Sequence, residues 1–249
     1  MNENELTQYK RVFITGANGF IGRALGELYR REGAEIRGID FTADPEMGVV
    51  AGDITKPGDW KDQLDGCDLI IHTAAVVSNT ASNDFAWQVN TLGTSQLLKL
   101  GVSKSVKRFV HVSSVAAYGF VIPEDVKEDY PVKANGNCYV DSKIAAEHAV
   151  LACHASGNMD CTIVRPTDVY GPGSRPWVTA PLEMIKAGQF MLPANGKSIF
   201  SPVYIDDLLT GMKLAAGLPS GAGQIFNLGG GLALTCEEFF SHHYRWLGK

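Results

Sequence analysis

The chain has 249 residues, of which 45% are hydrophobic and 20% charged, and its formal net charge is −5. This is the size and composition of one large domain, or of one domain with a small appendage. No apolar run approaches the roughly 18–20 residues of a membrane span, and there is no basic block, so we expect neither a membrane nor a nucleic acid as partner. The polar N-terminus lacks the apolar core of a signal peptide. The five cysteines are scattered and form no CxxC pair, which favours reduced thiols in a cytoplasmic compartment.

Up to residue 166, short apolar runs alternate with stretches of helical pattern. This alternation predicts a doubly wound parallel α/β sheet of Rossmann type, with helices on both faces. The predicted strands are 11–15, 34–40, 48–53, 68–75, 107–114 and 160–166, and the predicted helices are 20–33, 56–66, 84–104 and 139–157.

Beyond residue 166 the pattern changes. The stretch "TDVYGPGSRPW" is rich in Gly and Pro and is expected to be a loop. Two helices, 177–188 and 205–217, and a strand at 224–230 are expected to follow. We therefore predict a dinucleotide-binding domain at 1–166 and a smaller substrate-binding lobe at 167–249.

Three glycines stand between the first predicted strand and the first predicted helix. Gly16, Gly19 and Gly22 in "ITGANGFIG" allow a tight turn, a close backbone approach to a pyrophosphate and close packing of helix against strand. The helix N-terminus then offers free N–H groups to phosphate oxygens. The spacing G-x-x-G-x-x-G is one residue wider than the usual fingerprint, so a turn without a ligand is the alternative.

Two acidic residues end the second and third predicted strands. Asp40 can accept hydrogen bonds from the ribose diol of an adenosine, and a 2′-phosphate there would meet a like charge. Arg37 lies earlier on the same strand, so NAD is favoured over NADP. Asp53, in "GDI", belongs to the same carboxyl edge, where open α/β sheets bind their ligands.

The stretch "YVDSK" places Tyr139 and Lys143 four residues apart, on one face of a predicted helix. A neighbouring ammonium favours the phenolate and is expected to lower the pKa of the tyrosine, so that it can act as a general base or acid. Ser113 and Ser114 end the preceding predicted strand, and one of these hydroxyls can hold the reacting oxygen against the tyrosine. A surface pair of helix residues is the alternative.

Nine features in register, from about residue 11 to residue 230, make the chain resemble the extended short-chain dehydrogenase/reductases, the NAD-dependent epimerase/dehydratase family. They are "TGANGFIG", Asp40, "GDI", "HTAA", "NTLGT", "VSSVAAYG", "YVDSK", "RPTDVYGPG" and "VYIDDL".

The resemblance implies a catalytic set of Ser114, Tyr139 and Lys143, with Lys143 also bonding the nicotinamide ribose. Ser114 is chosen over Ser113 for its place in "SVAAYG". The cofactor-side positions that the resemblance implies are Gly16, Gly19, Phe20, Ile21, Gly22, Asp40, Asp53, Ile54, Ala74, Ala75, Asn90, Tyr139, Lys143, Pro166 and Val169.

Two departures from the family pattern leave the substrate open. Asp168 stands where many sugar-nucleotide members have Asn, and Cys138 where they have Pro. "HTAAVV" and "RPTDVYGPG" look closer to hydroxysteroid- and flavonol-type reductases. Family members often continue for several tens of residues after this point, so the substrate lobe is expected to be either short or incomplete.

The remaining features receive plainer interpretations. His242 and His243 lack an accompanying cluster of ligands, so we expect a solvated helix face and no metal. The helices 84–104 and 139–157 resemble the pair that forms a dimer interface in the family, which implies a homodimer.

We therefore expect an oxidoreductase that transfers a hydride between NAD and a secondary alcohol or ketone carbon, of a sugar nucleotide or of a hydroxysteroid- or flavonol-like molecule. Epimerase, dehydratase and net dehydrogenase activity all remain open. The alternative is a non-catalytic NAD-binding regulatory or scaffold protein.

Overall fold

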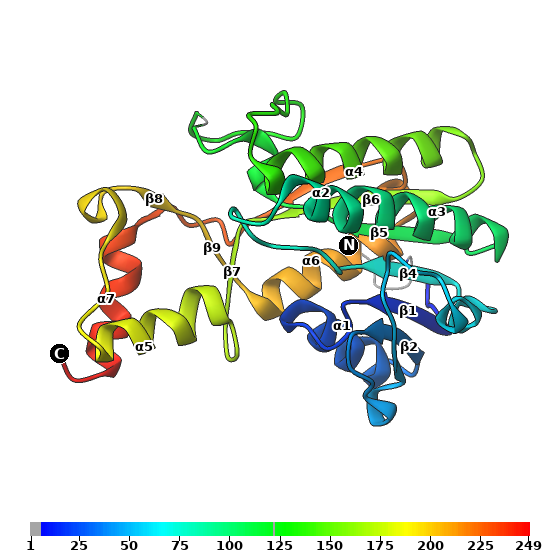
Figure 1. Cartoon of the computed structure of the whole chain (residues 1–249), viewed down its shortest axis with the longest axis horizontal. Helices are drawn as coiled ribbons and strands as arrows, with labels where there is room; N and C mark the ends of the chain where they lie inside the picture. The colour runs from blue at the N-terminus through cyan, green and yellow to red at the C-terminus, as the bar shows by residue number, and fades with distance from the viewer. Residues whose placement is uncertain (1–5, 122) are drawn as a thin grey trace. The chain divides into compact units, whose positions relative to one another are not determined.

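The computed structural model describes residues 6–121 and 123–249, and its main feature is a seven-stranded sheet (Figure 1). The strand order is β10-β6-β5-β4-β1-β2-β3. Neighbouring strands from β3 through β6 run parallel. The bounds are β1 Arg11–Thr15, β2 Glu35–Asp40, β3 Val49–Ala51, β4 Leu69–His72, β5 Arg108–Val112, β6 Asp160–Pro166 and β10 Ile225–Leu228. The predicted Rossmann-type sheet is confirmed.

The strand order reverses between β1 and β4, because β2 follows β1 on one side and β4 pairs with it on the other. The two chain segments that leave these strands therefore diverge, and open α/β sheets bind their ligands at the carboxyl edge of such a point. Every residue of β4 and β5 is buried, as expected for central strands covered on both faces.

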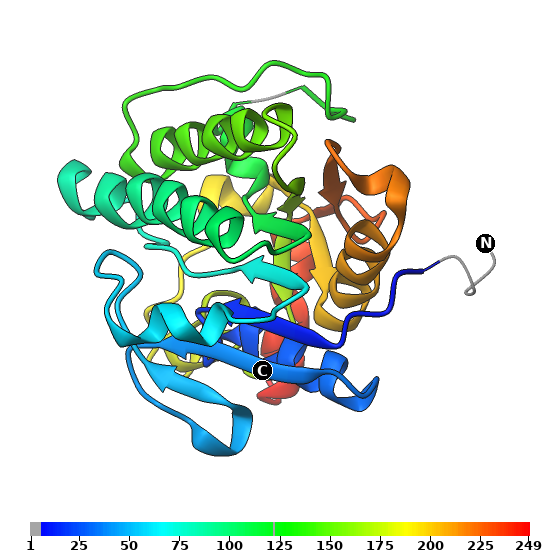
Figure 2. The ribbon, with the colours of Figure 1, turned by 90° about the vertical axis from the view of Figure 1, so that its right-hand side faces the viewer.

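Helices cover both faces of the sheet. In α1 (Phe20–Arg31) the buried residues Gly22, Leu25, Gly26 and Tyr29 form one apolar stripe at helical spacing. The opposite layer holds α3 (Thr94–Ser103) and α4 (Cys138–Ala155), which lie side by side in Figure 2.

The predicted helix 84–104 is a composite in the structure. It begins as α2 (Asn83–Ala86), widens into a π-helical segment at Trp87–Gly93 and continues as α3. The predicted helix 56–66 is a shorter 3-10 helix at Asp59–Leu64.

A second compact unit comprises Pro166–Gly211 and Leu228–Lys249. It contains α5 (Ala180–Lys186), α7 (Cys236–Trp246) and two small sheets. One sheet pairs β7 (Asp168–Tyr170) with β9 (Pro202–Tyr204), and the other pairs β8 (Ile199–Phe200) with β11 (Leu234–Thr235). The core of this unit is formed by Phe200, Cys236, Phe239 and Phe240.

The boundary between the units differs from the expected division at residue 166 in one respect. Helix α6 (Ile205–Gly217) begins in the second unit, but residues Met212–Asn227 belong to the first. These residues lead into β10, which extends the large sheet beside β6. A substrate-binding role for the second unit stays a prediction.

The stretch "TDVYGPGSRPW" is not wholly a loop, contrary to expectation. Its first residues form β7, because their backbone pairs with β9, more than 30 residues further along the chain. Its last residues begin a π-helical turn at Arg175–Thr179 that continues into α5.

Candidate active site

The glycine turn after β1 is built by backbone contacts that exclude side chains. Gly16 has a φ of +66°, and a Cβ there would lie 2.9 Å from the backbone nitrogen of Ala74. A Cβ on Gly22 would lie 2.2 Å from the carbonyl oxygen of Gly16. The first and third glycines therefore close the turn onto the β4 loop and onto helix α1.

Gly19 differs from the other two glycines because it is exposed and borders the start of α1. A Cβ there would meet only the Gly16 carbonyl oxygen, at 3.1 Å. Gly19 is the N-cap of α1, and no side chain caps the helix. The first turn, with Phe20 and Ile21, carries no acidic residue, so the positive end of the helix is left for an anion.

Asp40, at the end of β2, is held against this turn. One carboxylate oxygen accepts the backbone N–H of Asn18 at 2.9 Å, and the other accepts that of Phe41 at 2.7 Å. Each oxygen keeps a lone pair for a further donor, such as a ribose hydroxyl. The structure therefore places Asp40 beside the glycine turn.

Arg37, the cation considered for a 2′-phosphate, is engaged elsewhere. Its Nε donates to Glu35 at 2.8 Å, and its Nη1 donates to the carbonyl oxygens of Gln63 and Asp65. These partners hold the guanidinium back from the carboxyl end of β2.

Asp53 and Ile54 follow β3. The Asp53 carboxylate accepts the backbone N–H of Thr55 at 2.9 Å and its hydroxyl at 2.8 Å. Burial raises the pKa of Asp53, but the hydrogen bonds from Thr55 and the charge of Lys56 outweigh it, and the pKa is lowered overall. Ile54 is buried and packs against Gly93. Asp53 thus fixes its own turn, and Ile54 anchors that turn to the helical layer.

A chain of hydrogen bonds fixes the loop after β4, which carries Ala74 and Ala75. The Ala74 N–H donates to the Thr15 hydroxyl, which lies 2.6 Å from Nδ1 of His72. His72 Nε2 lies 2.8 Å from the Thr94 hydroxyl, which itself donates to the carbonyl of Asn90. His72 must therefore carry its proton on Nε2 and accept at Nδ1.

Asn90 serves the same loop from the π-helical segment. Its amide accepts the N–H of Val76 at 2.8 Å and donates to the Val76 carbonyl and to the hydroxyl of Ser142. The side chain is only 1% exposed. Asn90 therefore acts on the predicted cofactor side through the backbone of the β4 loop, which it ties to α4.

Ser114 and Tyr139 lie together at the carboxyl edge, as their place in the sequence predicts. Ser114 follows β5, and its hydroxyl accepts the N–H of Ala116 at 3.1 Å. Tyr139 lies in the first turn of α4, where Asn137 caps the helix. Burial raises the pKa of the Tyr139 phenol, and a hydrogen bond with the Ser114 side chain partly offsets this. The expected net lowering of this pKa is therefore absent from the protein on its own.

Ser113, the alternative to Ser114, lies beneath the site. It is 4% exposed, and its hydroxyl has no hydrogen-bond partner within residues 6–121 and 123–249. Both ring nitrogens of His111 are also without a partner in that part of the chain. The contact between Ser114 and Tyr139 thus supports the choice of Ser114.

Lys143 lies one turn along α4 from Tyr139 and is 3% exposed. Its Nζ donates a hydrogen bond to the carbonyl oxygen of Val112, at the end of β5, at 2.8 Å. Burial lowers the pKa of the ammonium to about 8, and the negative charge of Glu147 opposes this shift. Lys143 is therefore a strongly desolvated cation near neutral pH.

Glu147 and Arg165 form a buried ion pair that sequence reasoning missed. Arg165 donates from Nε and Nη2 to the two carboxylate oxygens of Glu147, at 2.9 and 2.6 Å. Its Nη1 donates to the Tyr118 hydroxyl at 2.7 Å, and the guanidinium lies 4.6 Å from the centre of that ring. The available signal was the four-residue spacing from Lys143 to Glu147, but nothing nearby in the sequence identified Arg165 as the partner.

Two predicted cofactor-side residues belong to the second unit. Pro166 ends β6, and Val169 lies on β7, where its carbonyl accepts the hydroxyl of Ser174 at 3.0 Å. Their contact with a cofactor stays a prediction.

The second unit has a pocket of about 410 Å³ with an apolar lining. Asp168 contributes a carboxyl group to this lining, and burial raises its pKa to about 6, partly opposed by the Ser201 N–H. The pocket is lined by Asp168, Pro176, Trp177, Ala180, Pro181, Met184, Phe190, Met191, Ile199, Phe200, Cys236 and Phe240.

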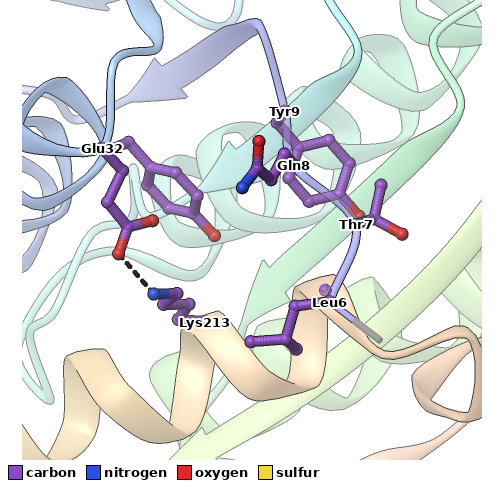
Figure 3. A pocket seen from close by; sticks show the side chains of 8 residues that line it. Leu6, Thr7, Gln8, Tyr9, Glu32 and Lys213 are labelled. Carbon is purple, nitrogen blue, oxygen red and sulfur yellow. Dashed lines mark hydrogen bonds and ion pairs between the residues drawn. The ribbon is translucent and has the colours of Figure 1, made fainter. Parts of the chain in front are cut away.

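Another pocket, of about 340 Å³, lies in the first unit away from all the predicted site residues. It is lined by the segment before β1 and by Tyr29, Glu32, Lys213 and Gly217. Figure 3 shows the ion pair between Glu32 and Lys213 at its wall.

The expected solvated face at His242 and His243 is wrong for His243. That side chain is 1% exposed, packs on Phe239 and Phe240, and its Nε2 lies 2.8 Å from the carbonyl oxygen of Trp177. Within residues 6–121 and 123–249, no three His, Cys, Asp or Glu side chains are placed to hold a metal ion. No helix in the same part of the chain is long and apolar enough to cross a membrane.

Comparison with known proteins identifies the group to which this arrangement is similar. The model of the NAD dependent epimerase/dehydratase family matches residues 12–229. A 3-beta-hydroxysteroid dehydrogenase of Mycolicibacterium neoaurum is 29% identical, over 94% of this chain and 69% of that protein. A dTDP-glucose 4,6-dehydratase of Actinoplanes is 27% identical, over 92% of this chain and 79% of that protein.

Solved structures give the same result. The dTDP-glucose 4,6-dehydratase DesIV from Streptomyces venezuelae, solved with NAD bound, superposes with a TM-score of 0.84 at 27% identity. The match covers 96% of this chain and 81% of that chain.

Proposed function

The chain belongs to the NAD-dependent epimerase/dehydratase family, and from this premise we propose how its residues carry out the reaction of an NAD-dependent oxidoreductase. When bound, NAD supplies the acceptor or donor of a hydride at a secondary alcohol or ketone carbon. The chain's own residues bind and orient the reactants and move the accompanying proton.

The residues present fit NAD. The turn formed by Gly16, Gly19 and Gly22 leads into a helix start that no side chain caps and that carries no acidic residue, as a pyrophosphate requires. Asp40 beside it has lone pairs free for the hydroxyls of an adenosine ribose. With Arg37 held by Glu35, no cation from β2 is available to a 2′-phosphate, which supports NAD over NADP.

We assign the proton transfer to the hydroxyl of Tyr139. In the oxidative direction its phenolate form takes the proton of the substrate hydroxyl, and in the reductive direction its phenol form donates a proton to the carbonyl oxygen. We assign the orientation of the same reacting oxygen to the Ser114 hydroxyl, which follows β5 and opposes the rise in the pKa of Tyr139. The proposal chiefly rests on the position of Lys143, which is buried one helical turn from Tyr139 and held by the carbonyl oxygen of Val112.

Lys143 has two proposed tasks. Its ammonium, one turn from Tyr139, favours the phenolate when the proton moves. By the family resemblance it also bonds the ribose next to the nicotinamide. The hydrogen bond to Val112 holds the side chain in place while leaving two N–H donors of the ammonium for this purpose.

The pocket of the second unit supports a hydroxysteroid- or flavonol-like substrate over a sugar nucleotide. Its lining is mainly aromatic and aliphatic, and among the residues that the structure describes it includes no basic side chain to pair with a diphosphate. The Asp168 carboxyl group can bond a hydroxyl group of an otherwise apolar ring system.

We further propose a cytoplasmic homodimer. Phe85, Trp87 and Leu92, on the segment that leads into α3, are large apolar side chains exposed by 49%, 40% and 63%. A second copy covering this segment would remove them from water. Light scattering of the purified protein, and of a variant with Trp87→Glu and Leu92→Glu, tests the association.

A panel of hydroxysteroids, flavonoid-like ketones and sugar nucleotides, followed by nicotinamide absorbance and by analysis for isomerised product, tests the reaction. We expect turnover of at least one compound by the natural sequence, and its loss in Tyr139→Phe with NAD binding retained. Binding of NAD without turnover of any compound, unchanged by Tyr139→Phe, would favour a regulatory or scaffold protein instead.

A further inference from the structure

Helix α4 places a cation and an anion one turn apart in the protein interior. Lys143 is 3% exposed and Glu147 is 2% exposed. Residues at this spacing lie on the same side of a helix. Two buried charges of opposite sign on one face interact far more strongly than the same pair would in water.

The titratable groups around Lys143 come from two strands and from α4 itself, and the cation of Arg165 comes from β6. Strand β4 contributes His72, β5 contributes His111, and α4 contributes Tyr139 and Glu147. Burial, reinforced by the charge of Lys143, lowers the pKa of His72 to about 3 and that of His111 well below its ordinary value. Both imidazoles are therefore neutral at physiological pH, and Glu147 is the group that compensates the ammonium.

Arg165, on β6, fixes the position of Glu147. The two parallel hydrogen bonds, at 2.9 and 2.6 Å, hold both carboxylate oxygens in a single orientation. This fork is characteristic of an ionised carboxylate. The hydrogen bond from Arg165 to Tyr118 and the contact with its ring lock the other side of the guanidinium. Glu147 therefore cannot turn to neutralise Lys143 by direct contact, and it acts on the lysine through its field.

We propose that Glu147, held in place by Arg165, is a positioning residue that keeps the proton on Lys143 Nζ at neutral pH. Its importance for turnover rests on the proposed role of Lys143. Without this carboxylate, the described ionisable groups around Lys143 would be neutral apart from the cation of Arg165, and burial would favour the uncharged form of the lysine. The ion pair thus maintains the charge that the tyrosine requires.

A purely structural ion pair is the competing interpretation, and direct titration of Lys143 separates the two. We would label the NAD-free protein with [ε-13C]lysine and follow the Cε resonance against pH, with Lys143→Met to assign it. The natural sequence should titrate near pH 8. Glu147→Gln should move the midpoint down by about one pH unit or more, because a neighbouring opposite charge is lost.

Arg165→Met is the matched control variant, and its expected effect on the Lys143 midpoint does not have the sign expected for Glu147→Gln. It breaks the same ion pair but removes the cation, so Lys143 should titrate at or above its natural midpoint. A structural role alone would destabilise both variants without moving their midpoints in different directions. An unchanged midpoint in folded Glu147→Gln, or a downward shift in both variants, would overturn the proposal.

Removal of one partner of a buried pair is costly, so Glu147→Gln alone could fail to fold. The double variant Glu147→Gln with Arg165→Met removes both members of the ion pair, so neither is left without its partner, and its Lys143 should still titrate below the natural midpoint. An unchanged midpoint there would equally overturn the proposal. Turnover enters none of these titrations, so a substrate panel without activity would leave their result intact.

Discussion

The ammonium of Lys143 donates a hydrogen bond to the carbonyl oxygen of Val112, 2.8 Å away, in a site where the lysine is 3% exposed. An ammonium that is so buried is less stable than one in water, and its pKa of about 8 expresses this cost. In the proposed active site, the buried charge of Lys143 therefore lowers the stability of the folded protein.

Replacement of Lys143 by Met should stabilise the fold at pH 7. The lowering of the pKa from 10.5 to about 8 corresponds to a burial cost of roughly 3 kcal/mol, at about 1.4 kcal/mol per unit. Loss of the bond to Val112 offsets about 1 kcal/mol of this, which leaves a gain on the order of 2 kcal/mol. Denaturant unfolding of both proteins measures the difference in free energy of unfolding.

The stability that Lys143→Met gains over the natural protein should decrease as the pH rises. Below pH 8 the lysine is protonated in both the folded and the unfolded chain, so the cost is fully present. Between pH 8 and 10.5 the folded protein releases its proton while the unfolded chain keeps it, and the natural protein becomes relatively more stable. The advantage of Lys143→Met should therefore shrink between pH 7 and 9.5. A constant or growing difference would show that Lys143 is not desolvated in this way.

Replacement of Tyr139 by Phe should remove turnover and leave NAD binding intact. The change deletes one hydroxyl and keeps the ring in place, while the glycine turn and Asp40 are untouched. We expect turnover to fall by roughly 10²–10⁴-fold, the usual contribution of a positioned acid or base. Steady-state kinetics on the compound found in the substrate panel, together with NAD titration, measure the two effects. Near-normal turnover would remove Tyr139 from the mechanism.

The tyrosine also has a pH signature. Burial raises the pKa of Tyr139 in the protein alone, where Lys143 is already present, so the lowering required for a base near neutral pH must come from the added charge of oxidised NAD. With [ζ-13C]tyrosine, the Tyr139 midpoint should fall when oxidised NAD is added. In Lys143→Met the midpoint should be higher than in the natural protein under the same conditions, and the residual activity should appear at higher pH.

The fold could be predicted from the sequence where local pattern decides structure. The strand 11–15 and the helix 205–217 were predicted with the bounds they have, because β-branched content and helical periodicity are local signals. Strand β7 was missed because its backbone is satisfied by β9, a partner distant in the sequence. Met212–Asn227 was placed in the wrong unit for the same kind of reason, since its strand completes a distant sheet.

The residues of the candidate site also divide into those that a local sequence pattern predicts and those that depend on partners distant in the sequence. Tyr139 and Lys143 could be found because their helical spacing is written in the sequence. The roles of Asn90 and Arg165 could not, because each depends on partners from other elements: Val76 and Ser142 for the first, Glu147 and Tyr118 for the second. His243 was expected at the surface because its identity suggests polarity, whereas three neighbouring aromatic rings bury it.

Asp40 should decide the choice between the two nicotinamide cofactors. NAD should bind more tightly than NADP, because the carboxylate bonds the ribose hydroxyls and repels a 2′-phosphate. Asp40→Ala should weaken the binding of NAD by about 1–3 kcal/mol. It should also reduce the difference in affinity between NAD and NADP. Arg37→Ala is the matched control, since that side chain is bound to Glu35 and should leave the preference unchanged. Calorimetric titration of both cofactors tests this, and tighter NADP binding by the natural protein would contradict it.

Substitution of the second glycine of the turn should affect NAD binding, whereas substitution of the third should affect stability. A side chain on Gly19 would meet only one backbone oxygen, at 3.1 Å, and would otherwise extend over the start of α1. Gly19→Val should therefore fold and lose NAD binding, because the side chain fills the space expected for the pyrophosphate.

Gly22→Ala provides the contrast. Its Cβ would lie 2.2 Å from the Gly16 carbonyl oxygen, a backbone atom that cannot move without opening the turn. We expect this smaller substitution to destabilise the protein by about 1–3 kcal/mol, as overpacked sites do, whether or not NAD is present. Thermal melts and NAD titrations of the two variants distinguish blocked binding from a damaged turn. A folded Gly19→Val protein with natural affinity for NAD would place the dinucleotide elsewhere on the chain.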